Sequence, residues 1–141
     1  VNFDQTMTLM KRIISFSDKR LAAFIANSFR EIFSYLSIDT EILMSSDIPK
    51  DNSLRGKDKI LQICEILGAD TYYNAIGGQN LYDKKEFSEH GIVLNFVDTI
   101  PKVYSQLRTK EFVPYLSMID VLMNNTKDEV NDLLDSFCVR Y

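Results

Sequence analysis

The stretch Ile63–Phe96, ICEILGADTYYNAIGGQNLYDKKEFSEHGIVLNF, decides the fold, because apolar strand-like runs alternate in it with helical patterns. Its first residues belong to the pattern Lys57–Leu67, which places apolar side chains on one helical face. Gly68 can adopt the left-handed conformation that ends a helix. The short run Thr71–Tyr73 that follows predicts a strand.

The second half of this stretch predicts another helix and another strand. Asp83 and Glu86 have the spacing of a capping box, which predicts a brief helix that stops at Gly91. Ile92–Val97 then alternates as a strand does. Upstream, the apolar run Ile42–Met44 ends in a polar turn and predicts a further strand. Helical crossovers between these three strands indicate a parallel sheet.

Helical patterns also flank the predicted sheet on both sides in the sequence. Apolar residues of Leu21–Leu36 recur at three- and four-residue intervals after the cap candidate Asp18. Ser117 with Asp120, and Thr126 with Glu129, have capping-box spacing and predict two closing helices. We therefore expect an α/β fold with a short, mostly parallel three-stranded sheet, flanking helices and a C-terminal helical pair. The last helix is predicted to bury Val130, Leu133, Leu134 and Phe137.

The composition is that of a globular protein without a nucleic-acid-binding surface. The 141 residues are 45% hydrophobic and 26% charged, which suits a single domain over residues 1–141. Twenty acidic and sixteen basic residues give a net charge of -4, so a broad cationic surface for phosphates is not expected. Nucleic acid is therefore excluded as the main partner.

The cysteines and the apolar runs indicate a reduced, cytoplasmic setting. Cys64 and Cys138 are the only cysteines and have neither metal-ligand nor CxxC spacing. Cys64 lies in an apolar helical pattern, where a small buried thiol is expected. The apolar runs are shorter than the roughly 20 residues that cross a bilayer, so no transmembrane segment is predicted.

In open parallel sheets, ligands bind beyond the carboxyl ends of the strands. This rule selects the turn Ser45–Asp47 and the segment that holds Gly77 and Gly78. Glycines allow backbone N–H groups to approach a phosphate or carboxylate, although a Gly-Gly pair is also an ordinary turn. Asp47 could act as a base toward an amine, or it could cap the turn before Pro49.

Tyrosines and a glutamine could line a pocket for a sugar or a nucleotide. Tyr72 and Tyr104 present flat apolar faces and hydroxyls, while packing at the sheet margin is the alternative. Gln106 follows Tyr104 by two residues, so both point to one side of an extended segment.

Serine catalysis is not favoured by the remaining polar residues. The spacing of Ser117 and Asp120 is typical of a helix cap, although Ser117 could also be considered as a nucleophile. His90 is the only histidine and precedes Gly91 at a predicted helix end, where a solvated imidazole is expected. A Ser-His triad and a histidine metal site are therefore not expected.

Several segments in order resemble one bacterial protein family. They are SSDIP at Ser45–Pro49, LQICEILGAD at Leu61–Asp70, GGQNLYDKKEF, GIVLNF, Tyr104 with Gln106, and FVPYLSMIDVLM. Together they are similar to the WbqC-like family, which occurs with enzymes of O-antigen and other surface-polysaccharide biosynthesis. The resemblance begins near Leu21 and indicates the C-terminal part of a family domain, without the N-terminal half rich in aromatic, Pro and Asn residues.

The resemblance implies two functional hypotheses. In the first, the protein is a transferase that adds an amino-acid (glycine) or acyl group to a sugar or nucleotide-sugar. In the second, it is a non-catalytic interaction module of a biosynthetic complex, with FVPYLSMIDVLM as the docking surface, and a homo-oligomer could form. The sequence does not identify a cofactor, and no metal is expected. The candidate catalytic residues are Asp47, Tyr104, Ser117 and Asp120, and the candidate binding residues are Ser45, Ser46, Tyr72, Gly77, Gly78 and Gln106.

Overall fold

The computed structural model describes residues 2–107 and 111–141, and the chain forms two compact units. The first, here called the helical unit, comprises Val1–Ile42 and Pro101–Ser136. The second, here called the sheet unit, comprises Leu43–Ile100 and Phe137–Tyr141. Each unit has its own cluster of buried side chains, so each is described separately.

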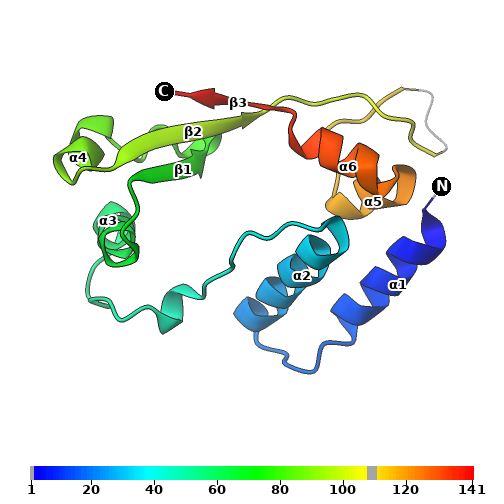
Figure 1. The fold of residues 1–141 in the computed structure, drawn as a ribbon, viewed down its shortest axis with the longest axis horizontal. Helices are drawn as coiled ribbons and strands as arrows, with labels where there is room; N and C mark the ends of the chain where they lie inside the picture. Colours follow the sequence, from blue (N-terminus) through cyan, green and yellow to red (C-terminus); the bar gives the residue numbers. More distant parts are fainter. Residues whose placement is uncertain (1, 108–110) are drawn as a thin grey trace. The chain divides into compact units, whose positions relative to one another are not determined.

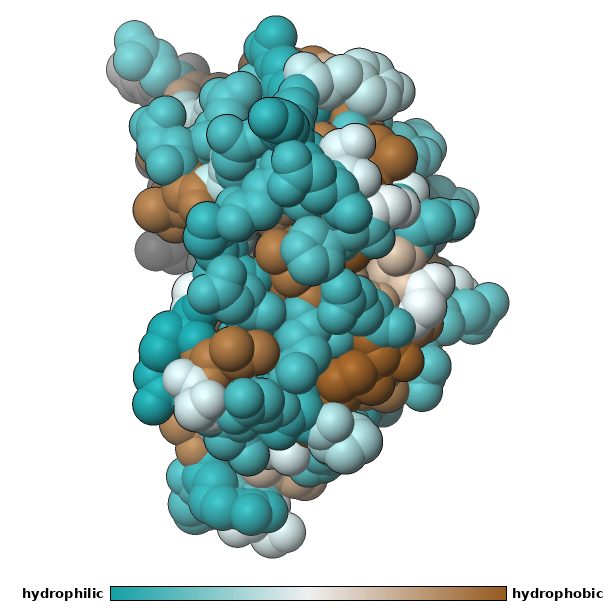
Figure 2. All heavy atoms as spheres, turned by 90° about the vertical axis from the view of Figure 1, so that its left-hand side faces the viewer, coloured by the Kyte–Doolittle hydropathy of each residue, from teal (hydrophilic) through white to brown (hydrophobic). Residues whose placement is uncertain are grey.

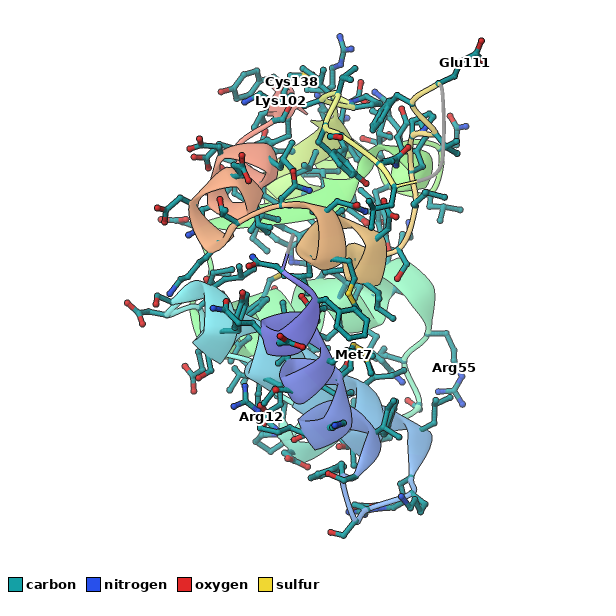
Figure 3. The ribbon with its side chains drawn as sticks, turned by 90° about the vertical axis from the view of Figure 1, so that its right-hand side faces the viewer. Met7, Arg12, Arg55, Lys102, Glu111 and Cys138 are labelled. Carbon is teal, nitrogen blue, oxygen red and sulfur yellow. The ribbon has the colours of Figure 1, made fainter. Side chains whose placement is uncertain are left out.

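The helical unit is built from four helices: α1 (Phe3–Ile14), α2 (Leu21–Leu36), α5 (Met118–Asn124) and α6 (Lys127–Leu134). Helices α1 and α2 form an antiparallel pair (Figure 1). Arg12, labelled in Figure 3, lies on α1, and its Nε is 2.9 Å from Oε2 of Glu31 on α2. Apolar side chains from all four helices make the core: Leu9, Ile13, Leu36, Leu122 and Val130.

A buried polar contact also joins the beginning of the helical unit to its end. The Thr6 hydroxyl donates to the Leu122 carbonyl over 3.0 Å, and Thr6 is fully buried. The Asn2 side-chain amide donates to the Asn125 carbonyl over 2.7 Å. Helix α1 is thereby fixed against α5, although the sequence analysis predicted no helix before Asp18.

The sheet unit contains β1 (Thr71–Ala75), β2 (Val93–Thr99) and β3 (Phe137–Arg140), in the order β1-β2-β3. Strand β1 pairs with β2 in parallel, and β3 pairs with β2 antiparallel (Figure 1). Helices α3 (Gly56–Leu67) and α4 (Lys84–Glu89) complete the unit, together with two short 3-10 turns. Its core contains Leu61, Cys64, Phe87, Ile92, Leu94 and Phe96.

The α/β class and the three-stranded sheet are confirmed, but one predicted strand is wrong. Ile42–Met44 forms no strand and leads into the 3-10 turn η1 (Ser45–Asp47). The third strand is β3, which contains Phe137, so the prediction that Phe137 is buried in the last helix is also wrong. Helix α6 stops at Leu134, three residues earlier, and Leu134 is exposed, so its predicted burial is wrong as well.

The helix ends agree with the predicted signals in most places. Gly68 ends α3 in the left-handed conformation at φ 65°, as predicted. Thr126 and Glu129 form a complete capping box on α6. Asp83 caps α4 by accepting from the Lys85 N–H, whereas Glu86 instead forms an ion pair with Lys57.

One prediction about a helix end is wrong. The side chain of Asp18 does not cap α2, since the N-cap is Arg20, whose backbone N–H donates to Asp18 Oδ1 over 3.0 Å. His90 is exposed as predicted, and its Nδ1 also lies 2.6 Å from Oε1 of Glu65. The predicted burial of Cys64 is confirmed, and this burial raises the pKa of its thiol.

Within the described part of the chain, no helix has both the length and the apolar character needed to cross a membrane. The face in Figure 2 is largely hydrophilic, and apolar side chains reach it in separate patches.

Helix α5 offers a matched pair of substitutions that tests the core of the helical unit. Leu122 is 1% exposed and Ile119 is 42% exposed on the same helix. We expect Leu122→Ala to lower the free energy of unfolding by about 2–5 kcal/mol, because it leaves a cavity. Ile119→Ala should cost about 1 kcal/mol or less. Urea unfolding followed by circular dichroism measures both, and equal losses would contradict this core.

Candidate functional site

The segment after β2 carries two polar side chains to one carboxylate. The Tyr104 hydroxyl donates to Oδ2 of Asp120 over 2.7 Å. The Gln106 side-chain amide donates to the same oxygen over 3.1 Å. Tyr104 and Gln106 are two residues apart, and in an extended segment such residues point to the same side. Both side chains reach Asp120, as the sequence predicted.

Gln106 also holds the chain that returns toward α5. Its Nε2 donates to the Val113 carbonyl over 2.9 Å, and its Oε1 accepts from the Val113 N–H over 2.8 Å. The ring of Phe112 packs edge-on against Tyr104, with 5.1 Å between the ring centroids. Gln106 therefore bonds both to the backbone of Val113 and to Asp120 on α5.

Asn124 completes the set of donors around the carboxylate. Its Nδ2 donates to Oδ1 of Asp120 over 3.1 Å and to the Asp120 carbonyl over 2.8 Å. Its Oδ1 accepts from the Leu107 N–H over 3.3 Å. Residues four apart share one face of a helix, so α5 presents Asp120 and Asn124 together. We call Tyr104, Gln106, Asp120 and Asn124 the Asp120 cluster.

Ser117 determines where the helix of the Asp120 cluster begins. Its hydroxyl oxygen accepts from the Ile119 N–H over 3.2 Å, which makes it the N-cap of α5. The capping interpretation is therefore confirmed. Asp120 does not complete a capping box in return; its side chain turns to Tyr104 and Gln106 instead.

The electrostatics of the Asp120 cluster favour a protonated phenol. Burial raises the pKa of Tyr104 above its usual value, and the hydrogen bond to the Asp120 carboxylate and the charge of that carboxylate add to the effect. The Gln106 amide also donates to the Tyr104 hydroxyl over 3.3 Å, and this hydrogen bond lowers the pKa of Tyr104. The Tyr104 hydroxyl therefore stays protonated and donates to the Asp120 carboxylate. The described hydrogen-bond partners of this carboxylate are all neutral groups.

A hollow of about 250 Å³ adjoins the Asp120 cluster, and we call it the Tyr104 hollow. Tyr104 and Asn124 belong both to the cluster and to the wall of the hollow. Its other described walls combine amide, hydroxyl, cationic and anionic groups with two apolar side chains: Lys102, Val103, Ser105, Asn125, Glu129, Asp132 and Leu133. The sequence analysis missed Asn124, although its position four residues after Asp120 is a usable signal.

The serine turn of the sheet unit is held by local contacts. Ser46 donates to Oδ1 of Asp47 over 3.1 Å, and the Asp47 N–H donates to the Met44 carbonyl over 2.9 Å. The Lys50 ammonium donates to the Ser45 carbonyl. Ser45, Ser46 and Asp47 stay predictions as ligand-binding or catalytic groups.

The glycine pair has a packing role at one of its two positions. Gly77 and Gly78 lie in the 3-10 turn η2 (Ile76–Gly78) directly after β1. A Cβ on Gly78 would lie 2.9 Å from Nδ2 of Asn74, whereas Gly77 faces open space. Gly78 therefore makes room for Asn74, and anion binding by the pair stays a prediction.

Tyr72 lies against the core of the sheet unit. Its ring stacks on Phe87 at 5.6 Å between centroids and meets Tyr82 edge-on at 6.1 Å. Burial raises the pKa of Tyr72 to about 12, with a further contribution from Tyr82. These contacts explain the residue by packing, so ligand binding by Tyr72 stays a prediction.

Comparison with known proteins identifies the family of this chain. The model of the WbqC-like protein family matches residues 1–132, so the match also includes the segment before Leu21, where no resemblance was predicted. The chain belongs to the WbqC-like family. No curated protein and no solved structure matches the sequence. The matched region of this WbqC-like chain includes every residue of the Asp120 cluster.

The ionisation of Tyr104 tests the electrostatics of the Asp120 cluster. We expect its phenol to titrate above the ordinary pKa of about 10. Because the folded state holds this proton more tightly, its contribution to stability is complete below about pH 10 and is lost as the pH rises through the raised pKa. Asp120→Asn should lower the pKa only in part, because burial is the largest cause.

Carbon-13 NMR of ring-labelled tyrosine measures this titration, and Tyr104→Phe identifies the signal. A Tyr104 signal that titrates at or below the ordinary tyrosine value would contradict the described hydrogen bond.

Proposed function

We propose that this WbqC-like protein is a transferase of surface-polysaccharide (O-antigen) biosynthesis. The reaction proposed is transfer of an amino-acid (glycine) or acyl group to a sugar or nucleotide-sugar in the cytoplasm. The observation that carries the proposal is the Asp120 carboxylate, one oxygen of which accepts from both Tyr104 and Gln106, together with the polar hollow that Tyr104 and Asn124 of the same cluster line. Family membership supports the setting, and the geometry supports the choice of site.

Acyl transfer to a sugar requires a group that accepts a proton from the attacking hydroxyl or amine. A carboxylate held in place by neutral donors is suited to this role. In the proposal Asp120 is the base: it takes the proton of the attacking hydroxyl or amine as that group bonds to the acyl carbon, and the bond from the acyl carbon to the donor's leaving group breaks, with its electron pair going to the leaving group. Tyr104 and Gln106 hold its Oδ2 and can turn toward an incoming carbonyl or hydroxyl group. Ser117 acts as a positioning residue, because its cap starts α5 three residues before Asp120.

The walls of the Tyr104 hollow match the groups of such substrates. Side-chain amides and hydroxyls pair with sugar hydroxyls, and Asn124, Asn125 and Ser105 supply them. The carboxylates of Glu129 and Asp132 can attract the ammonium group of an amino acid. Lys102 can attract a phosphate or carboxylate of the donor or acceptor.

Substitution of the proposed base tests the reaction. We expect Asp120→Asn to lower the turnover number by about 10²- to 10⁴-fold, the usual contribution of a general base, with a smaller change in KM. Tyr104→Phe should cause a smaller loss, because Gln106 still holds the same carboxylate oxygen. Labelled glycyl and acetyl donors are incubated with a panel of nucleotide-sugars, and products are followed by mass spectrometry.

Asp128→Asn is the matched control, because Asp128 is an exposed acid on α6 that belongs neither to the Asp120 cluster nor to the wall of the hollow. Transfer by the original protein that Asp120→Asn leaves unchanged would rule out Asp120 as the base. Transfer by none of the donor and acceptor pairs would contradict the proposed reaction.

A specific observation also favours the interaction module as a second candidate. Within FVPYLSMIDVLM, Met118, Val121 and Leu122 pack in the core, but a second set of apolar side chains is exposed. Tyr115 is 77% exposed and holds a backbone φ of 58°, which is unusual for a residue other than glycine. The exposed set is Val113, Tyr115, Leu116 and Ile119.

The second candidate predicts that these side chains bind a second copy of the chain. We expect the average mass to rise with concentration, and Tyr115→Ser with Leu116→Ser to reduce this rise because apolar contact area is lost. Light scattering after size-exclusion chromatography measures it. Leu21→Ser is the control, because Leu21 is an exposed apolar residue on α2. A monomer at all concentrations would contradict self-association.

A further inference from the structure

We propose that the helical unit binds peripherally to an anionic lipid bilayer. The binding surface consists of the end of α1, the connection to α2 and the first half of α2, and we call it the α2 tip. It combines four exposed apolar side chains with two exposed cations: Ile14, Leu21, Ile25, Phe29, Lys11 and Lys19. None of these residues belongs to the Asp120 cluster or lines the Tyr104 hollow, so the inference does not depend on the proposed transferase reaction.

The apolar stripe of α2 is longer than the core that covers it. Its members recur at intervals of three and four residues and so share one face of the helix: Leu21, Ile25, Phe29, Ile32 and Leu36. Leu36 is 2% exposed and belongs to the core, and Ile32 packs against that core. Leu21, Ile25 and Phe29 are instead 74%, 43% and 49% exposed. The same stripe is therefore core at the end of α2 and exposed at its beginning.

The positions of the other helices in the unit account for this difference. Helix α5 bonds to the beginning of α1, where the Thr6 hydroxyl donates to the Leu122 carbonyl. The loop-facing end of α2 meets α6, since the Asn131 side-chain amide donates to the Leu36 carbonyl over 3.4 Å. The connection between α1 and α2 lies at the opposite end of this pair (Figure 1). Ile14, the last residue of α1, is 63% exposed there.

The charge of the α2 tip is opposite in sign to that of the whole chain. Residues 11–21 contain four basic residues and one acidic residue, a net charge of +3, whereas the whole chain has a net charge of -4. Arg12 and Arg20 form ion pairs with nearby carboxylates. Lys11 and Lys19 are exposed, and the Lys19 ammonium donates to a neutral group, the Phe16 carbonyl, over 2.9 Å. These two lysines therefore carry the net positive charge of the tip.

An exposed apolar helix face beside cations fits the interface of a bilayer that contains anionic lipid. Apolar side chains of such a helix enter the boundary between headgroups and acyl chains, while lysine ammonium groups stay at the level of the phosphates. Leu21 and Phe29 are about 12 Å apart along the helix axis, so a helix parallel to the bilayer inserts both together. A purely apolar protein partner would account for the stripe but not for the positive charge beside it.

Tryptophan fluorescence tests insertion, because the chain contains no tryptophan. Leu21→Trp is mixed with vesicles of phosphatidylcholine that contain about one third phosphatidylglycerol. We expect its emission to shift to shorter wavelength as the indole leaves water. Phosphatidylcholine alone should give little shift, and added salt should reduce the shift because binding is partly electrostatic. Leu81→Trp is the matched control, because Leu81 is 70% exposed in the sheet unit, and its emission should stay unchanged.

Sedimentation with the same vesicles measures the apolar contribution. Ile25→Ser with Phe29→Ser should weaken binding about tenfold or more, because these side chains no longer enter the bilayer. Both residues are exposed, so the fold should be retained, which circular dichroism checks.

The same measurement separates specific from general charge attraction. Lys11→Gln with Lys19→Gln should weaken binding to the anionic vesicles about tenfold. Lys84→Gln with Lys85→Gln is the matched control, because it removes two exposed lysines from α4 in the sheet unit and should leave binding unchanged.

Three results would overturn the inference. The first is a Leu21→Trp variant whose emission does not shift and which does not sediment with anionic vesicles. The second is equal weakening by the two lysine pairs, which would indicate general charge attraction. The third is a lipid-free dimer that Ile25→Ser with Phe29→Ser dissociates, which would assign the stripe to a second copy. The Asp120→Asn variant should bind vesicles as the original chain does, so failure of the transferase proposal is distinguishable from failure of this one.

Discussion

The Asp120 carboxylate is the interaction on which the candidate site depends. Its two oxygens accept from three side chains, with Tyr104 and Gln106 on one oxygen and Asn124 on the other. An ionised carboxylate only accepts hydrogen bonds, so it organises donors from separate segments around one point. The Gln106 side chain also forms two hydrogen bonds with the backbone of Val113. Without the carboxylate, Tyr104 and Gln106 would lose the acceptor that they share.

Much of this site follows from local sequence rules, but its assembly does not. The common direction of Tyr104 and Gln106 follows from strand-like alternation, and the role of Ser117 follows from cap spacing. The same spacing led to Asp120 being interpreted as half of a capping box. An acidic residue three positions after the N-cap can complete a capping box or bond to a distant side chain. The sequence is the same in both cases, so only the folded structure shows which hydrogen bond Asp120 forms. Asn124 could have been found from its place one turn after Asp120.

The strands of the sheet could also be predicted only in part from local sequence. Strands β1 and β2 were predictable because Gly68 and Gly91 separate them clearly from the helices before them. Ile42–Met44 is equally apolar, yet a strand exists only where a neighbour accepts its backbone bonds. Phe137 continues the helical spacing of Leu133 and Leu134, so the apolar pattern predicts a longer helix there and gives no signal for the start of β3. The pairing of β3 with β2 is a long-range contact that no local pattern encodes.

Asp120 and Asn95 differ in how far their side-chain oxygens are hydrogen-bonded. The Asp120 carboxylate accepts from three side chains, and each hydrogen bond restricts its position. Asn95 has an oxygen with no partner, so the fold bears the cost of burying it without the compensating bond. An apolar residue of similar size would remove that cost at a position inside a strand.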